Sequence, residues 1–103
     1  MEYKIIIADR ANNDLYQVSS YISDELHAPQ SALNLIDEIY QLIISLKQMP
    51  KKYALSPDER LAQKGMRMVA IQNYLIFYTV DENIKSVNVA RILYGRRDWT
   101  NLL

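Results

Sequence analysis

Residues 66–94 read MRMVAIQNYLIFYTVDENIKSVNVARILY, and this stretch decides the fold. Segments 66–71, 74–80 and 84–94 are rich in Val, Ile, Tyr and Phe, the composition typical of β-strands. The connections Gln72-Asn73 and Asp81-Glu82-Asn83 consist of residues that favour turns. The sequence therefore predicts three consecutive strands that pair antiparallel.

Side chains of the middle strand are expected to alternate between the two faces of the sheet. Alternation assigns Tyr74, Ile76, Tyr78 and Val80 to one face and Leu75, Phe77 and Thr79 to the other. Most of the aromatic side chains here are expected to fill the core, with the tyrosine hydroxyls reaching water.

The first half of the chain predicts one strand and two helices. Residues 3–8 (YKIIIA) form a short apolar run of the kind found in buried strands. Leu15, Val18, Ile22 and Leu26 then recur every three or four positions along one face of a helix, for which Asp9 offers an N-cap. Pro29 ends that helix and suits the first turn of the next. The apolar stripe of the second helix, which stops near Pro50, consists of Ala32, Leu35, Ile36, Ile39, Leu42, Ile43 and Leu46.

The order of elements predicts an α+β fold, β-α-α-β-β-β. Two helices joined by a short turn should pack as a hairpin, and their apolar faces should cover one face of a small, mainly antiparallel twisted sheet. The opposite face is expected to stay partly open. Residues 51–65 are expected to form a surface loop with a short helical turn after Ser56, and residues 95–103 must dock on the sheet or on a partner. With 103 residues, the range 1–103 is expected to be a single domain.

Charge is distributed unevenly along a chain that is formally neutral. Residues 1–50 hold three basic and seven acidic side chains, a net charge of −4, whereas residues 51–103 hold nine basic and five acidic ones, a net charge of +4. This polarity indicates a basic face in the second half that meets an anionic partner. The alternative is that solvated loops happen to be rich in Lys and Arg.

Composition argues against several classes of site. One His and no Cys leave only carboxylates as charged metal ligands, and the acidic pairs at 58–59 and 81–82 fit solvated turns, so no metal is expected. Two glycines form no phosphate-binding loop, and no serine has a His partner, so no cofactor is expected either. Neither a targeting segment nor a membrane-length apolar run is present, which leads to the expectation of a cytoplasmic protein with no membrane partner.

The motifs of the whole chain, taken in order, resemble those of toxins of the RelE/ParE superfamily. In the first half the resemblance rests on Ala8, Asn13-Asp14-Leu15, Tyr21-Ile22, Pro29-Gln30-Ser31-Ala32 and Leu46-Lys47-Gln48-Met49-Pro50. In the second half it rests on Gly65-Met66-Arg67, residues 73–81 (NYLIFYTVD) and residues 87–99 (VNVARILYGRRDW). The closing RILYGRRDW looks ParE-like, so the ParE-like branch is favoured.

The resemblance implies the toxin of a type II toxin–antitoxin system, neutralised by a cognate antitoxin in a hetero-oligomer. ParE-like members poison DNA gyrase, and RelE-like members cut mRNA on the ribosome. Fold membership does not choose between these activities. A third alternative is a non-toxic interaction module of the same fold.

A nuclease would use Arg67, Arg91 and Tyr94, because RNA cleavage needs a base, an acid and cations around the phosphate. Arg67 and Arg91 are interpreted as residues of the open sheet face. Three features argue against this reading. The one histidine, His27, lies at the helix turn, Tyr94 has an unperturbed pKa of about 10, and a pI of about 6.6 suits a ribosome binder poorly.

The tail offers a second candidate surface. Trp and Arg are enriched at binding hot spots, and Arg96, Arg97 and Trp99 follow the last strand directly. Together with Arg67, Arg91 and Tyr94, they are predicted to bind the target or the antitoxin. In the competing interpretation, Trp99, Leu102 and Leu103 fold back to cap the core. The reading favoured is a ParE-like toxin that acts on gyrase by binding rather than as an enzyme.

Overall fold

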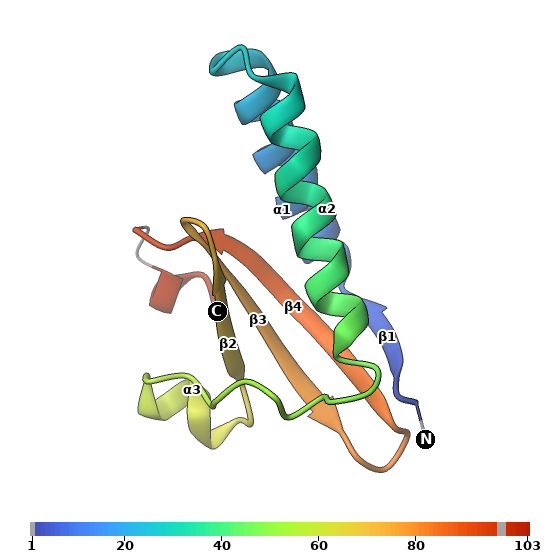
Figure 1. Cartoon of the computed structure of the whole chain (residues 1–103). Coiled ribbons are helices and arrows are strands. Elements are labelled where there is room, and N and C mark those ends of the chain that lie inside the picture. Colours follow the sequence, from blue (N-terminus) through green and yellow to red (C-terminus); the bar gives the residue numbers. More distant parts are fainter. Residues whose placement is uncertain (1, 97–98) are drawn as a thin grey trace.

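The computed structural model describes residues 2–96 and 99–103, and it confirms the α+β fold. The sheet has the order β1-β4-β3-β2, in which β1 pairs parallel with β4 and the other pairs are antiparallel. A helical hairpin of α1, η1 and α2 lies across it (Figure 1). The elements are β1 (Lys4–Ile7), α1 (Asp9–Ser20), η1 (Tyr21–Glu25), α2 (Pro29–Ser45), α3 (Glu59–Gln63), β2 (Arg67–Ile71), β3 (Tyr74–Asp81), β4 (Ser86–Tyr94) and η2 (Trp99–Asn101).

The hairpin follows the predicted pattern with two differences at its ends. The N-cap of α1 is Ala8 and not Asp9. Asp9 is the first helical residue, and its carboxylate interacts favourably with the positive end of the helix dipole. At its other end, α1 runs into the single π-helical turn η1. His27 is exposed and has φ = 50°, a left-handed conformation that turns the chain into α2, where Pro29 is the first residue. The tip of the hairpin extends well beyond the sheet (Figure 1).

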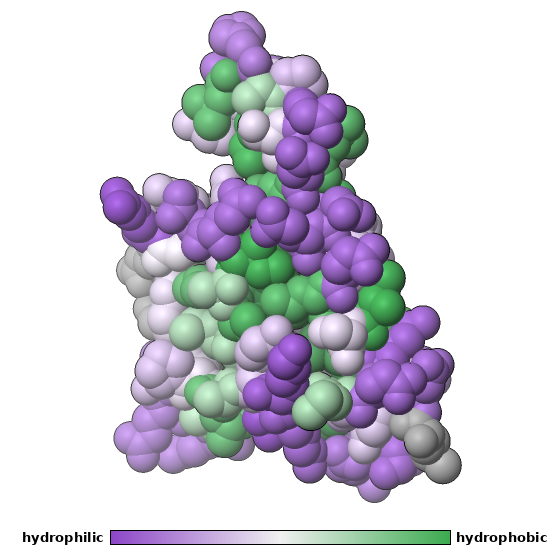
Figure 2. Space-filling view, viewed as in Figure 1, coloured by the Kyte–Doolittle hydropathy of each residue, from purple (hydrophilic) through white to green (hydrophobic). Residues whose placement is uncertain are grey.

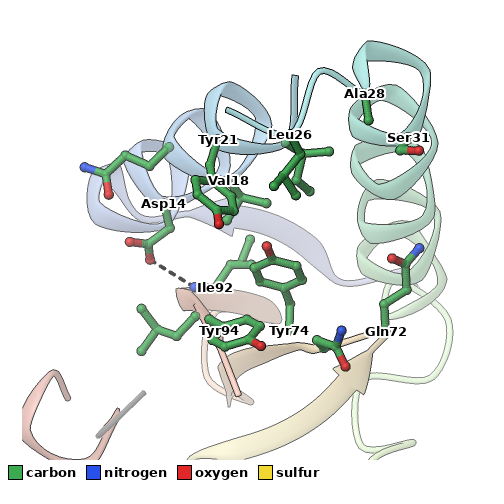
Figure 3. A pocket seen from close by; sticks show the side chains of 14 residues that line it. Asp14, Val18, Tyr21, Leu26, Ala28, Ser31, Gln72, Tyr74, Ile92 and Tyr94 are labelled. Carbon is green, nitrogen blue, oxygen red and sulfur yellow. Dashed lines mark hydrogen bonds between the residues drawn. The ribbon is translucent and has the colours of Figure 1, made fainter. Parts of the chain in front are cut away.

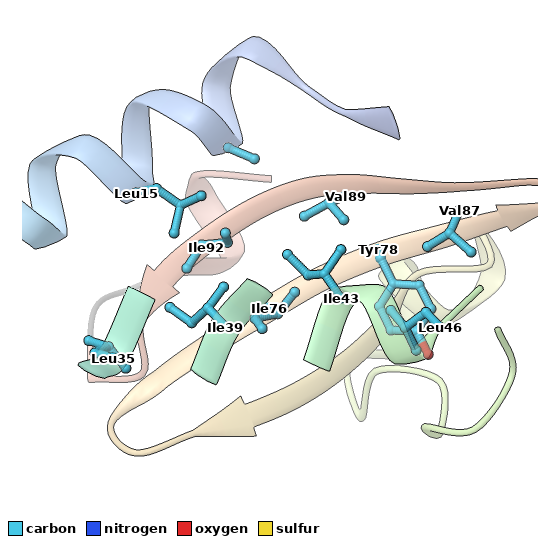
Figure 4. Close-up of a cluster of buried hydrophobic side chains, with 11 residues drawn as sticks. Leu15, Leu35, Ile39, Ile43, Leu46, Ile76, Tyr78, Val87, Val89 and Ile92 are labelled. Carbon is cyan, nitrogen blue, oxygen red and sulfur yellow. The ribbon is translucent and has the colours of Figure 1, made fainter. Parts of the chain in front are cut away.

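The main core lies between the hairpin and one face of the sheet (Figure 4). Leu35, Ile39 and Ile43 of α2 recur at the spacing of one helix face, and each is buried. They meet Ile76 and Tyr78 of β3, which share a sheet face as alternation predicts. The other buried members of this helix-side cluster are Ala11, Leu15, Leu46, Val87, Val89 and Ile92.

The opposite face of the sheet carries a second, smaller cluster. Its buried residues are Leu61 of α3, Phe77 of β3 and Leu93 of β4. Trp99, Leu102 and Leu103 pack against them, with the Trp99 ring centroid 5.2 Å from that of Phe77. The prediction that this face stays partly open is therefore wrong where α3 and residues 99–103 cover it, and the tail does fold back onto the sheet.

The tip of the hairpin carries both polar and apolar surface. Figure 2 shows hydrophilic and hydrophobic residues side by side at that end, and further hydrophobic residues where the hairpin meets the sheet. None of the helices in residues 2–96 and 99–103 combines the length and apolar character that crossing a membrane requires.

Candidate functional site

Arg91 of β4 is held by an ion pair with Asp14 of α1. Its Nε donates to Asp14 Oδ2 at 2.8 Å and its Nη2 to Asp14 Oδ1 at 2.9 Å, a bidentate geometry. Its Nη1 donates to the carbonyl oxygen of Leu102 at 3.0 Å. The hydrogen bonds to Asp14 raise the pKa of Arg91 above its usual value. Arg91 thus joins α1, β4 and the C-terminal segment, and its side chain is only 12% exposed.

Asp14 also completes the hydrogen bonding of β4 where this strand extends beyond the end of β1. Pairing between β1 and β4 ends at Val89, so the backbone of β4 beyond that point has no neighbouring strand on this side. Asp14 Oδ2 accepts a hydrogen bond from the Ile92 amide at 3.0 Å (Figure 3). A buried carboxylate that accepts three donors is well compensated for the loss of water.

Arg67 lies apart from Arg91, on the other face of the sheet. In β2 it pairs with Tyr78, whose side chain belongs to the helix-side cluster, whereas Arg91 pairs with Phe77 of the opposite face. The prediction that both arginines lie on the open face is therefore wrong for Arg67. Its Nη1 donates to the carbonyl oxygen of Tyr53 at 2.7 Å, which fastens the loop before α3.

Tyr94 ends β4 on the helix-side face, against Tyr74. The two rings pack edge to face with centroids 5.6 Å apart. Arg67 and Tyr94 share this face but pair with opposite ends of β3, at Tyr78 and Tyr74. These two positions are four residue steps apart along β3, which corresponds to roughly 13 Å. The structure therefore does not bring Arg67, Arg91 and Tyr94 together.

A cleft of about 730 Å³ lies under the tip of the hairpin, and we call it the hairpin cleft. Val18, Tyr21 and Leu26 face it from the hairpin, and Tyr74 and Tyr94 form its floor at the end of the sheet (Figure 3). Gln72, in the turn between β2 and β3, lies at its edge. Burial, and then the nearby phenols of Tyr94 and Tyr21, raise the pKa of Tyr74, so the phenol stays neutral.

Of the predicted tail residues Arg96, Arg97 and Trp99, the structure describes the first and the last. Arg96 is exposed directly after β4, whereas Trp99 is half-buried in the opposite-face cluster. Arg97 lies outside the described residues. Among residues 2–96 and 99–103 there is no group of three or more His, Asp or Glu side chains arranged to hold a metal ion.

Of the residues at this site, the sequence predicted Tyr94 but not Asp14, Tyr21 or Tyr74. Asp14 offered a signal, because it lies between Ala11, Leu15 and Val18 on the apolar face of α1, where an unpaired acid would be costly. Tyr21 and Tyr74 offered none, since nothing local in the sequence indicates that η1 and the end of β3 meet.

One family model matches most of the chain. The family model described as the ParE toxin of the type II toxin–antitoxin system parDE matches residues 5–99. No curated protein matches the sequence.

Solved structures share the fold at low sequence identity. The chromosomal ParDE TA system from P. aeruginosa superposes with a TM-score of 0.73 and 20% identity, over 90% of this chain and 96% of that one. A mutant of the E. coli toxin RelE in the free state superposes with a TM-score of 0.70 and 12% identity, over 99% of this chain and 93% of that one. A chain of the intact E. coli RelBE toxin–antitoxin complex superposes with a TM-score of 0.63 and 12% identity, over 92% of this chain and 99% of that one.

Proposed function

The chain belongs to the ParE toxin family of type II toxin–antitoxin systems, and from this premise we propose that it poisons DNA gyrase by binding and is neutralised by a cognate antitoxin. The membership confirms the resemblance to RelE/ParE toxins and favours the ParE-like branch. The gyrase target and the antitoxin partner are inferences that rest on the arguments below.

The separation of Arg67, Arg91 and Tyr94 is the observation that carries the proposal for a binding mechanism. Cleavage of RNA needs a base, an acid and a cation around one phosphate. Arg91 lies on one face of the sheet and is tied to Asp14. Arg67 and Tyr94 lie on the other face, roughly 13 Å apart along the strand direction and on strands that β3 separates. The Tyr94 ring packs edge to face on Tyr74, while Arg67 donates to the Tyr53 carbonyl and Arg91 to Asp14.

Positive charge after β4 supports a binding surface. Arg96 is exposed, and Arg97 follows it in the sequence. Arginine is enriched at binding hot spots because its planar head makes several directed hydrogen bonds. The remaining cations of the predicted site, Arg67 and Arg91, are engaged inside the protein, so we assign the contact with gyrase to the tail.

An antitoxin partner is supported by the structural relatives. The similar structures from P. aeruginosa and E. coli are those of toxin–antitoxin systems. This chain also presents an unfilled cleft lined by apolar and aromatic side chains, a kind of surface that partner segments occupy in complexes. We therefore infer that an antitoxin segment enters the hairpin cleft.

A paired assay on one preparation tests the proposal. The purified chain should inhibit supercoiling by gyrase and leave mRNA intact on translating ribosomes. Arg96→Ala combined with Arg97→Ala should weaken the inhibition roughly tenfold, whereas Arg10→Ala, an exposed arginine of α1, should not change it.

The alternatives predict different results in the same assay. Cleavage of ribosome-bound mRNA that Arg67→Ala abolishes would replace the proposal with a RelE-like endonuclease. No effect in either assay, and normal growth of cells that express the chain without its antitoxin, would leave a non-toxic interaction module.

A further inference from the structure

The hairpin cleft brings together aromatic side chains from three separate elements. Tyr21 comes from η1, Tyr74 from the start of β3 and Tyr94 from the end of β4. The Tyr74 and Tyr94 rings pack edge to face at 5.6 Å, and Tyr21 lies near enough to influence the ionisation of Tyr74. Tyrosine rings present a negative face to whatever lies between them, which attracts cations.

No cation of the protein occupies this position among the described residues. The lining holds no Lys or Arg, and the sequence contains neither between Arg10 and Lys47. Arg91, which lies close by, is neutralised by Asp14. The hairpin also carries exposed acids at Asp24 and Glu25, in the same turn as Tyr21. The charged residues in the lining and in η1 are therefore acidic, namely Asp14, Asp24 and Glu25.

The rest of the lining is apolar or carries amide groups. Val18 and Leu26 face the cavity from the hairpin, and the Leu26 side chain is 55% exposed (Figure 3). Gln72 and Asn73 supply amide carbonyls at the sheet end. Such a cleft suits a cationic head that stacks on the rings and donates hydrogen bonds, carried on a segment whose neighbouring side chains are apolar.

We propose that the hairpin cleft receives an arginine side chain, flanked by apolar residues, from a segment of the antitoxin. This inference rests on the proposed antitoxin partner, and it specifies the side chain that the cleft recognises in that partner. Arginine fits better than lysine, because the planar guanidinium stacks on aromatic rings and sheds water more easily. Its hydrogen-bond donors match the tyrosine hydroxyls and amide carbonyls of the lining.

A pair of isosteric peptides tests the selection. N-acetyl-Leu-Arg-Leu-amide and N-acetyl-Leu-citrulline-Leu-amide differ essentially in charge, and each is titrated into the full chain with tyrosine and backbone NMR signals as the readout. The arginine peptide should bind roughly 2- to 30-fold more tightly. Signals of Tyr21, Tyr74 and Tyr94 should shift most.

Single substitutions locate the effect. Tyr21→Leu keeps an apolar wall, and since Tyr21 is 53% exposed the change should leave the fold intact. It should lower the ratio of the two affinities towards one, and Tyr94→Leu should do the same. Tyr16→Leu is the matched control, because Tyr16 lies in α1 shortly before η1, is 71% exposed and does not line the cleft. The ratio should not change in this control.

Three results would overturn the proposal: equal affinity for the two peptides, chemical shift changes confined to residues outside the cleft, or no binding of the arginine peptide at about 10 mM. The titration involves neither gyrase nor ribosomes. A chain that inhibits gyrase but binds both peptides equally therefore rejects only the selection of arginine. A chain that prefers the arginine peptide, yet remains toxic when its antitoxin is co-expressed, rejects the antitoxin part of the proposed function.

Discussion

The two faces of the sheet are covered in different ways. Among the described residues, the helix-side cluster has eleven buried members, from α1, α2, β3, β4 and the turn after α2. The opposite-face cluster has three, against which Met, Leu and Trp side chains pack. Long helices supply the first cover, and the five-residue α3 and residues 99–103 supply the second. Short covers with few buried contacts open more readily, so local stability should differ between the faces.

One ion pair connects the two covers. Asp14 is a buried residue of α1, in the hairpin. Arg91 extends from the opposite face to bind Asp14, and the same guanidinium donates to the Leu102 carbonyl. The bond between Arg91 and Asp14 therefore fastens α1 to the edge of β4 and the C-terminal segment to the sheet. Breaking the pair should affect both faces, whereas a change within either cluster should affect mainly one.

Asp14→Ala should cause the largest loss of stability. The substitution leaves the Arg91 guanidinium and the Ile92 amide without their acceptor in a poorly hydrated place. Removal of one partner from a buried ion pair costs about 4 kcal/mol, which chemical denaturation would measure as a lower free energy of unfolding. Asn13→Ala, an exposed neighbour, is the control. A loss below about 1 kcal/mol would mean that the pair behaves like one on the surface.

Ile39→Ala should weaken the helix-side face alone. Ile39 is fully buried at the centre of α2, and the cavity left behind should lower the free energy of unfolding by about 3 kcal/mol. Leu33→Ala on the exposed side of the same helix should change it little. If both substitutions cost the same, the proposed division of α2 into a buried and an exposed side would be incorrect.

The sequence was sufficient for most of the fold, because most of its elements follow from local periodicity. The stripe on α2 and the alternation along β3 both predicted which side chains are buried. The covering of the opposite face was not predictable in this way. It depends on how α3 and residues 99–103 return to the sheet, and no periodic pattern encodes that return.

The candidate site was predicted less well, because it depends on register. A shift in the pairing of β3 with β4, between Phe77 and Tyr78, leaves Ala90 as an extra residue and sets the face on which Arg91 lies. The partner of Arg91 is 77 positions away in the sequence. A single sequence shows that these charges exist, but the distance between them follows only from the assembled sheet.

Trp99→Ala should weaken the opposite face selectively. Trp99 is half-buried on Phe77, so the expected loss of about 2 kcal/mol is smaller than that for a fully buried aromatic residue. Amide hydrogen exchange should accelerate in β2 and α3 and stay slow in α2. Equal acceleration in α2 would show that the two faces unfold together and that their covers do not differ in local stability.

The smallest effect is expected at the far end of the sheet, where polar contacts join Tyr3, the residue before β1, to the turn after β3. The Tyr3 hydroxyl donates to Glu82 at 2.7 Å, and Lys51 and Lys85 each lie 3.2 Å from the same carboxylate. The hydrogen bond from Tyr3, then that from Lys85, lowers the pKa of Glu82 to about 2.

Because the pKa of Glu82 is lower in the folded state, its contribution to stability is present above the ordinary value near 4.5 and is lost as pH falls towards 2. Tyr3→Phe removes the largest cause, so the pKa should rise while the two lysines keep it below the ordinary value. Titration of the Glu82 carboxyl by NMR measures this, with Tyr16→Phe as the control that should not move it. Glu82 is exposed, so added salt should weaken the lysine contribution more than the hydrogen bond from Tyr3. A pKa that stays near 2 in Tyr3→Phe would assign the effect to the lysines, and the attachment of β1 would then depend on ionic strength.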